Sequence, residues 1–193
     1  MPSINRIVMT KSTRNLLGLL PLADMDAIEI SGKFGRRFTF KSYDRLRYPK
    51  YDICAGPYRD EAGEVRRCDI VLANQVWEHL DRPYTATRNV YEMLRPGGYF
   101  WLAVPFYIPF HSSPVDCSRW SARGLKNLLI EGGFAEADIV SEQWGNRAAA
   151  ARNLEPKWPP AYDADTDDLT NDPKFPIVSW ALAQKGLTNE KAE

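Results

Sequence analysis

The sequence predicts an α/β domain built around a doubly wound, mostly parallel sheet. Residues 69–73 (DIVLA) form a short apolar run, which is typical of a strand buried on both faces. From Pro83 the apolar residues fall at helical spacing as far as Leu94, and residues 99–104 form a second strand-like run. A strand, a crossover helix and a strand of this length make one right-handed βαβ unit.

Cap and turn residues mark where the other elements begin and end. Ser12 or Thr13 is expected to cap the first helix and Ser121 a later one. Pro96-Gly97-Gly98 supplies a tight turn after the helix of the βαβ unit. Helices are expected at residues 12–20, 83–94, 122–131 and 146–154. Further strands are expected at residues 27–30, 37–43 and 51–54, within 134–144, and at 177–184.

The first half of the predicted sheet is short of helical cover. Only residues 31–36 separate the strands at 27–30 and 37–43, whereas a parallel crossover normally needs a dozen residues or more. The first crossover helices are therefore expected to be truncated. Because aromatic residues crowd this span, we expect a second copy of the chain to cover the exposed face, giving a homodimer. The alternative is cover from within one chain, by the N-terminal helix or the acidic loop 157–176.

Composition narrows the class of protein. The 193 residues carry a formal net charge of zero, which gives no indication of a nucleic-acid or membrane partner. We expect one domain over residues 1–185 and a disordered tail over 186–193. The three cysteines are scattered, as expected for reduced thiols in a cytoplasmic protein. With only two histidines, no metal site is expected.

Three signals in one order carry a family resemblance. They are Asp69 opening a strand, the pair Glu78-His79, and Leu94-Arg95-Pro96-Gly97-Gly98 before the next strand. This pattern resembles the class I S-adenosylmethionine-dependent methyltransferases of the type 11-like group. The resemblance implies a Rossmann-like sheet whose last strand, at 177–184, is antiparallel. It also implies S-adenosylmethionine as the cofactor.

The glycine loop departs from the family pattern. Glu29, Gly32 and Gly35 follow the first strand, but the glycine spacing is neither the family's nor the G-x-G-x-x-G of a dinucleotide-binding loop. An NAD-dependent enzyme is therefore disfavoured. The altered loop also leaves open a degenerate methyltransferase-like domain without turnover, acting as a binding or assembly subunit.

The resemblance implies a cofactor site at the carboxyl edge of the sheet. Glu29 would organise the methionine end, Asp44 would bind the ribose hydroxyls, and Asp52 would accept from the adenine amine. For each acid a structural role is the alternative, and for Asp44 the shortened crossover makes it equally favoured. Glu78 and His79 more often brace the loop in this family. The cofactor-binding residues are expected to be Glu29, Gly32, Asp44, Asp52, Asn74 and Gln75.

His111 is the candidate catalytic residue. It stands in a proline- and aromatic-rich loop beside Asp116 and Arg119, where the family places its substrate. A neutral imidazole can take a proton from an attacking hydroxyl or amine near pH 7. The alternative is a surface histidine. The expected activity is methyl transfer to an oxygen or nitrogen of a small-molecule acceptor, with a sugar-like acceptor as the first guess.

Overall fold

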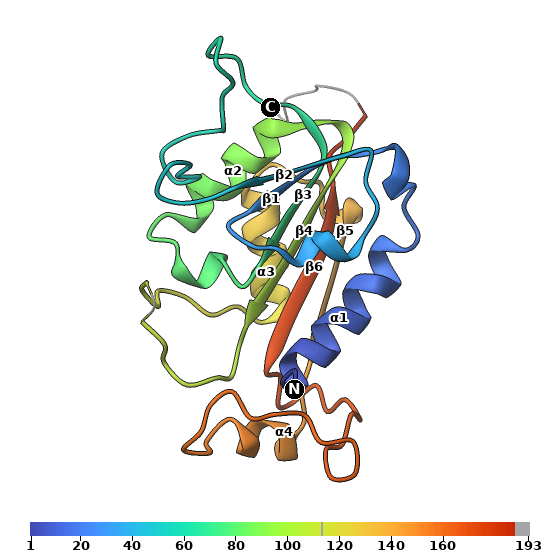
Figure 1. The fold of residues 1–193 in the computed structure, drawn as a ribbon, viewed down its shortest axis with the longest axis vertical. Helices are drawn as coiled ribbons and strands as arrows, with labels where there is room; N and C mark the ends of the chain where they lie inside the picture. The colour runs from blue at the N-terminus through green and yellow to red at the C-terminus, as the bar shows by residue number, and fades with distance from the viewer. Residues whose placement is uncertain (113, 188–193) are drawn as a thin grey trace.

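A computed structural model describes residues 1–112 and 114–187, so most of the predicted tail at 186–193 lies outside the described residues. These residues form one six-stranded sheet with helices on both faces (Figure 1). The strands are β1 (Asp26–Ile30), β2 (Ser42–Leu46), β3 (Cys68–Asn74), β4 (Leu94–Pro105), β5 (Ile139–Trp144) and β6 (Val178–Gln184). The helices are α1 (Ile4–Leu17), α2 (Pro83–Met93), α3 (Ala122–Glu131) and α4 (Arg147–Arg152).

The sheet order is β2-β1-β3-β4-β6-β5. The pairs from β2 to β4 are parallel, whereas β6 pairs antiparallel with both β4 and β5. The α/β class, the mostly parallel sheet and the antiparallel last strand are therefore confirmed. Described residues include no helix that is long and apolar enough to cross a membrane.

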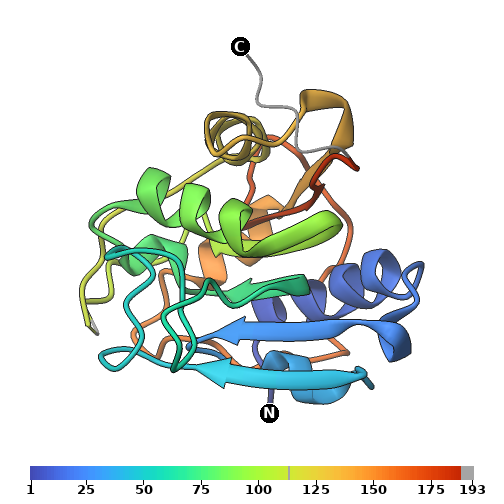
Figure 2. The ribbon, with the colours of Figure 1, turned by 90° about the horizontal axis from the view of Figure 1, so that it is seen from above.

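The helices form two layers on the sheet. One apolar cluster joins α2 and α3 to side chains such as Val71, Phe100 and Leu102. A second cluster joins α1 and α4 to the alternate residues of the same strands, among them Leu72 and Trp101. Figure 2 shows α2 and α3 on one side of the sheet and α1 on the other. Alternate residues of each strand thus point to opposite faces of the sheet and pack into two separate cores, as expected for a sheet buried on both faces.

The Pro96-Gly97-Gly98 stretch lies within β4 and not in a separate turn before it. The register with β3 moves from Cys68 opposite Leu94 to Ile70 opposite Tyr99, so β4 carries a bulge there. Gly97 has φ 78°, a left-handed conformation that favours glycine. The helix before the bulge accordingly ends at Met93.

Two strand predictions in the first half are wrong. Residues 34–37 form a 3₁₀ turn, η2 (Phe34–Arg37), and β2 starts only at Ser42. Its register is fixed by a contact distant in sequence, because Ser42 Oγ donates to Asp26 Oδ1 at 2.8 Å. Residues 51–54 form a turn, since the Asp52 carboxylate accepts from the Cys54 amide at 2.9 Å.

The first helix begins earlier than predicted, at Ile4 with Ser3 as its cap. Ser12 and Thr13 are buried inside it, and both hydroxyls donate to the Met9 carbonyl, at 3.1 and 2.6 Å. They are therefore not capping residues. Apolar residues at both ends of α1, Ile4 and Leu17, lie in the second cluster, which explains why the helix extends over this face.

The truncated first crossover is confirmed, because only η2 connects β1 to β2. The aromatic residues of this span pack in series, with ring centroids 5.9 Å apart for Phe34–Phe38, 6.2 Å for Phe38–Phe40 and 5.8 Å for Phe40–Tyr43. Phe38, Phe40 and Tyr43 also pack against the cluster that contains α1. This face thus has cover from within the chain. The homodimer stays a prediction, which light scattering at micromolar concentration checks.

Candidate functional site

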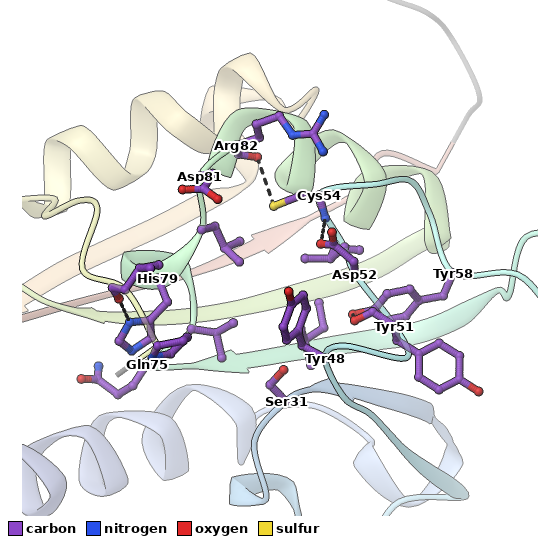
Figure 3. A pocket seen from close by; sticks show the side chains of 16 residues that line it. Ser31, Tyr48, Tyr51, Asp52, Cys54, Tyr58, Gln75, His79, Asp81 and Arg82 are labelled. Carbon is purple, nitrogen blue, oxygen red and sulfur yellow. Dashed lines mark hydrogen bonds between the residues drawn. The ribbon is translucent and has the colours of Figure 1, made fainter. Parts of the chain in front are cut away.

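A pocket of about 310 Å³ lies at the carboxyl ends of β1 and β3 (Figure 3). Ligands of open α/β sheets bind at this edge. Figure 3 shows Gln75 and His79 on one side of the pocket and Asp52, Tyr48 and Tyr51 on the other. The lining comes from the strand ends, the loop 48–58 and the segment after β3: Ile30, Ser31, Tyr48, Tyr51, Asp52, Ile53, Cys54, Tyr58, Gln75, Val76, His79, Leu80, Asp81, Arg82, Pro114 and Val115.

Two residues of the pocket hold a left-handed backbone without being glycine. Ser31 has φ 58° and Gln75 has φ 55°, and they follow the neighbouring strands β1 and β3. Each is anchored to the next strand: Ser31 N donates to the Leu46 carbonyl at 2.9 Å, and Gln75 N to the Ala103 carbonyl at 2.8 Å. Such backbone strain costs about 1–3 kcal/mol and gathers at ligand sites. Here the left-handed residues turn the backbone sharply where β1 and β3 reach the edge of the pocket.

Glu29 lies beneath the pocket loop and not in the lining. Its carboxylate is fully buried and accepts hydrogen bonds from Phe34 N at 2.6 Å and Gly35 N at 2.7 Å, and from the Tyr43 hydroxyl. Burial and the Glu29 carboxylate raise the pKa of Tyr43. The acid therefore fixes the backbone of the loop that contains Gly32. Neither Glu29 nor Gly32 lines the pocket.

Of the other predicted cofactor residues, the structure brings Asp52 and Gln75 into the pocket. Asn74 Oδ1 instead accepts from the Trp101 indole at 3.3 Å, and Asn74 is not in the lining. Asp44 lies on β2, outside the lining, where its half-exposed carboxylate pairs with Arg66. The segment that follows β2 contributes Tyr48 and Asp52 to the pocket.

His111 does not line the pocket itself but contacts His79, which does. The two imidazole rings lie edge to face with centroids 5.0 Å apart, and His79 is in the lining. The loop that contains His111 is tied down because Cys117 N and Ser118 N donate to the Glu78 carbonyl, at 2.7 and 3.2 Å. On its other side, the His111 ring lies 5.5 Å from that of Trp158.

Asp116 holds His111 in place. The His111 amide donates to Asp116 Oδ2 at 2.8 Å, and the Arg119 guanidinium pairs with both oxygens of the same carboxylate. Hydrogen bonds from Arg119 lower the pKa of Asp116 to about 2. Partial burial lowers the pKa of His111, so the neutral imidazole predominates near pH 7. A neutral ring is the form that can accept a proton.

Trp158 lines a second hollow of about 430 Å³ next to His111. Asn153 is buried there and fixes the walls, because its side chain donates to the Tyr107 carbonyl at 2.9 Å and accepts from the Trp158 indole at 3.1 Å. The hollow is mostly apolar: Tyr107, Ile108, Pro109, Asn153, Leu154, Glu155, Pro156 and Trp158 line it. His111 thus stands between two hollows.

The first pocket has the size and the mixed lining of a small-molecule site. Its volume is at the lower end of the range for ligand pockets, about 300–1,000 Å³. Tyrosine rings offer flat apolar walls, while the Asp52 carboxylate can accept from an amine or hydroxyl and the Gln75 amide can donate or accept. The donor and acceptor set therefore suits a purine nucleoside.

The fold is similar to that of class I methyltransferases, and the chain matches known members of that group over part of its length. Residues 13–102 match the family model of a methyltransferase domain. A curated relative from Mycolicibacterium smegmatis, named a probable S-adenosylmethionine-dependent methyltransferase, is 30% identical over 102 residues, which are 50% of this chain and 40% of that protein. The chain thus spans less than half the length of this relative.

Solved structures show the same fold. An S-adenosylmethionine-dependent methyltransferase from Mesorhizobium loti matches with a TM-score of 0.54 at 14% identity, over 89% of this chain and 96% of that one. One from Archaeoglobus fulgidus matches with a TM-score of 0.53 at 13% identity, over 93% and 94% of the two chains. Together these comparisons show similarity to S-adenosylmethionine-dependent methyltransferases over about half of the chain and the same fold over most of it.

Sequence reasoning missed several residues of the site. Ser31 and Tyr48 line the pocket, and both follow strands, a position that could have signalled them. Asp81 lines it too, two residues after His79. Glu78 was expected to brace the loop, which its backbone carbonyl does; its carboxylate, however, is fully buried and accepts no hydrogen bond from the described residues.

Proposed function

We propose that the chain transfers a methyl group from S-adenosylmethionine to an oxygen or nitrogen of a small, sugar-like acceptor. The observation that carries this proposal is the position of the histidine pair. His79 lines the nucleoside-sized pocket, and His111 stands between that pocket and the hollow at Trp158. S-adenosylmethionine supplies a methyl group that its sulfonium already activates. The protein must then mainly hold two molecules in line.

The residues of the first pocket would bind the nucleoside. Asp52 keeps one carboxylate oxygen on the Cys54 amide at 2.9 Å, which fixes its orientation toward the pocket. Gln75 is fixed by its strained backbone, and its Nε2 lies 3.3 Å from Met9 Sδ. The loop on Glu29 would border the methionine end, as the resemblance implies. Preorganised groups lose less freedom on binding than mobile ones do.

His111 would act on the acceptor. Its neutral ring would take the proton that the attacking hydroxyl or amine loses, and Asp116 would stabilise the imidazolium that forms. General-base assistance of this kind contributes roughly 10²–10⁴-fold. The hollow beside Trp158 supplies a flat apolar wall, which supports a ring-shaped acceptor with hydroxyl groups. Three free cysteines support a reducing, cytoplasmic setting.

The test begins with S-adenosylhomocysteine, the product form of the cofactor, titrated into the full chain by calorimetry. We expect one binding site per chain. Turnover is then followed as S-adenosylhomocysteine formation with a panel of sugars and amino sugars. Binding with turnover on at least one acceptor supports the proposal, and an absence of binding at millimolar ligand overturns it.

A degenerate domain that binds without turnover is the second candidate. Two observations favour it: the Glu29 carboxylate is fully engaged by the loop, and Asp44, the acid expected on the ribose, lies outside the pocket lining. Binding of S-adenosylhomocysteine with no turnover on any acceptor class would support this candidate over the enzyme.

A further inference from the structure

Three side chains beside the pocket converge on one point, and His79 is the one that lines it. Glu78, His79 and His111 each offer one oxygen or nitrogen atom, and these atoms all lie within 4.8 Å of one another. His79 Nε2 and Glu78 Oε1 are 3.8 Å apart. Ligand atoms on a tetrahedral zinc ion lie roughly 3.4 Å apart, given bonds of about 2.1 Å. Small side-chain rotations would therefore bring the three atoms onto one ion.

The Glu78 carboxylate lacks a partner within the described residues. It is 0% exposed, and neither of its oxygens accepts a hydrogen bond there. Burying a carboxylate in this way is costly unless a cation or a donor meets it. Asp116 already engages the nearest guanidinium, that of Arg119, through both oxygens. A cation supplied from outside the chain would satisfy the buried acid.

His79 is oriented from behind by a backbone carbonyl, as metal-binding histidines usually are, and His111 lies beside a carboxylate. His79 Nδ1 contacts the Val115 carbonyl, so this nitrogen carries the proton and Nε2 keeps its lone pair for the cluster. His111 Nδ1 lies 3.4 Å from Asp116 Oδ2, which Arg119 holds in turn. Two imidazoles and one carboxylate form a ligand set that suits zinc or another first-row transition ion and does not favour magnesium.

We propose that Glu78, His79 and His111 bind a divalent transition-metal ion, with Zn²⁺ as the probe. This differs from the expectation of no metal site, which rested on the low number of histidines. Its role in turnover rests on the proposed function: an ion at this point adjoins both the pocket and the acceptor side, where it would lower the pKa of a bound hydroxyl and so replace proton transfer to the His111 ring. The binding of the ion itself does not depend on that function.

The test is calorimetric titration of the chelator-treated full chain with Zn²⁺, and with Mg²⁺ as the contrast. We expect one Zn²⁺ per chain and no heat from Mg²⁺. Glu78→Gln and His111→Ala should each weaken Zn²⁺ binding at least 100-fold. Cys117→Ser, which removes an exposed thiol outside the cluster, should leave it unchanged. Co²⁺ should give visible absorption bands that Glu78→Gln abolishes.

Circular dichroism and the thermal melting midpoint of each variant show that it is folded. Equal Zn²⁺ affinity in the wild type and in both folded cluster variants overturns the site, as does loss of binding in Cys117→Ser alone. A wild-type chain that binds S-adenosylhomocysteine but not Zn²⁺ overturns the metal site and leaves the proposed function intact. The reverse result overturns the function and leaves the metal site intact.

Discussion

A methyl group added at Gly32 would lie 2.0 Å from Glu29 Oε1. The Glu29 side chain has no room to move away, because the loop amides and the Tyr43 hydroxyl hold both of its oxygens. Gly35 is constrained in the same way, since a methyl group there would lie 2.5 Å from Tyr43 and 2.9 Å from Glu29 Oε2. The two glycines allow the loop to close on a buried acid.

Gly32→Ala should therefore destabilise the protein and weaken S-adenosylhomocysteine binding together. Overpacking of this kind costs about 1–3 kcal/mol. Gly124→Ala is the matched control, because a methyl group there meets its nearest neighbour at an ordinary 3.5 Å and lies within α3. Thermal melting should show a lower midpoint for the first variant and an equal or higher one for the second. Equal midpoints would contradict the role of Gly32.

The left-handed backbone at Ser31 predicts a dependence on side-chain branching. Ser31→Val should lower the melting temperature, since a β-branched residue is a strong outlier at φ 58°. Ser31→Gly should not lower it, because glycine adopts this conformation without steric cost. Melting curves of the two variants decide the point. A valine variant as stable as wild type would show that the turn after β1 is not left-handed in solution.

The two acids assigned to the nucleoside should behave differently. Asp52 lines the pocket, so Asp52→Ala should weaken S-adenosylhomocysteine binding by about 10-fold, the loss of one hydrogen bond to a charged group. Asp44→Ala should change the affinity less than twofold, because Asp44 pairs with Arg66 outside the lining. Calorimetry measures both. A large effect of Asp44→Ala would restore the ribose role that the resemblance implies.

His111→Ala should lower turnover and leave cofactor affinity nearly unchanged. The ring contacts His79 and Trp158 and is not itself in the pocket lining, which explains the expected separation. Loss of a general base costs roughly 10²–10⁴-fold in rate. Steady-state kinetics and an S-adenosylhomocysteine titration on the same preparation give the comparison. Equal losses in both would place His111 on the cofactor.

The hydrogen bond between Trp77 and Thr87 should contribute to the stability of the segment next to the site. The Trp77 indole is buried and donates to Thr87 Oγ1 at 3.0 Å, which anchors the turn before Glu78 to α2. Thr87→Val keeps the side-chain volume but leaves the indole N–H without its acceptor, at a cost of about 1–3 kcal/mol. Thr87→Ser, which keeps the hydroxyl, should lose less. Denaturant unfolding of the two variants measures the difference, and the reverse order would contradict the anchoring role.

The elements that local pattern predicts well are the buried ones. Residues 69–73 lie in β3, and 177–184 nearly coincide with β6, because an apolar run between polar flanks is a local signal. The alternation at 37–43 was misleading. Phe38 and Phe40 face the α1 cluster from a loop, and the register of β2 depends on Asp26, which no local pattern reveals.

In the site too, local sequence signals predict some residues, whereas contacts between distant segments determine the others. Gln75 was predictable from its position after a strand, and it lines the pocket. Asp52 also lines the pocket, although the strand predicted for it at 51–54 is a turn. The meeting of Glu78, His79 and His111 depends on Cys117 and Ser118 docking on the Glu78 carbonyl, a contact between segments distant in the chain. Sequence spacing carries no signal of that contact.

Arg95, from the sequence pattern that first indicated the family, lies far from the chemistry. Its guanidinium bridges the carboxylates of Asp26 and Asp69, at 2.9 Å each, where β1 and β3 begin. The pocket is at the opposite ends of those strands. These ion pairs hold β1 and β3 in register without taking part in the pocket, so they can persist when the ligand-binding side chains change. Among distant relatives of the domain, an arginine at the position of Arg95 would indicate a shared fold. The residues that follow β1 and β3 would indicate whether the relative still binds a ligand.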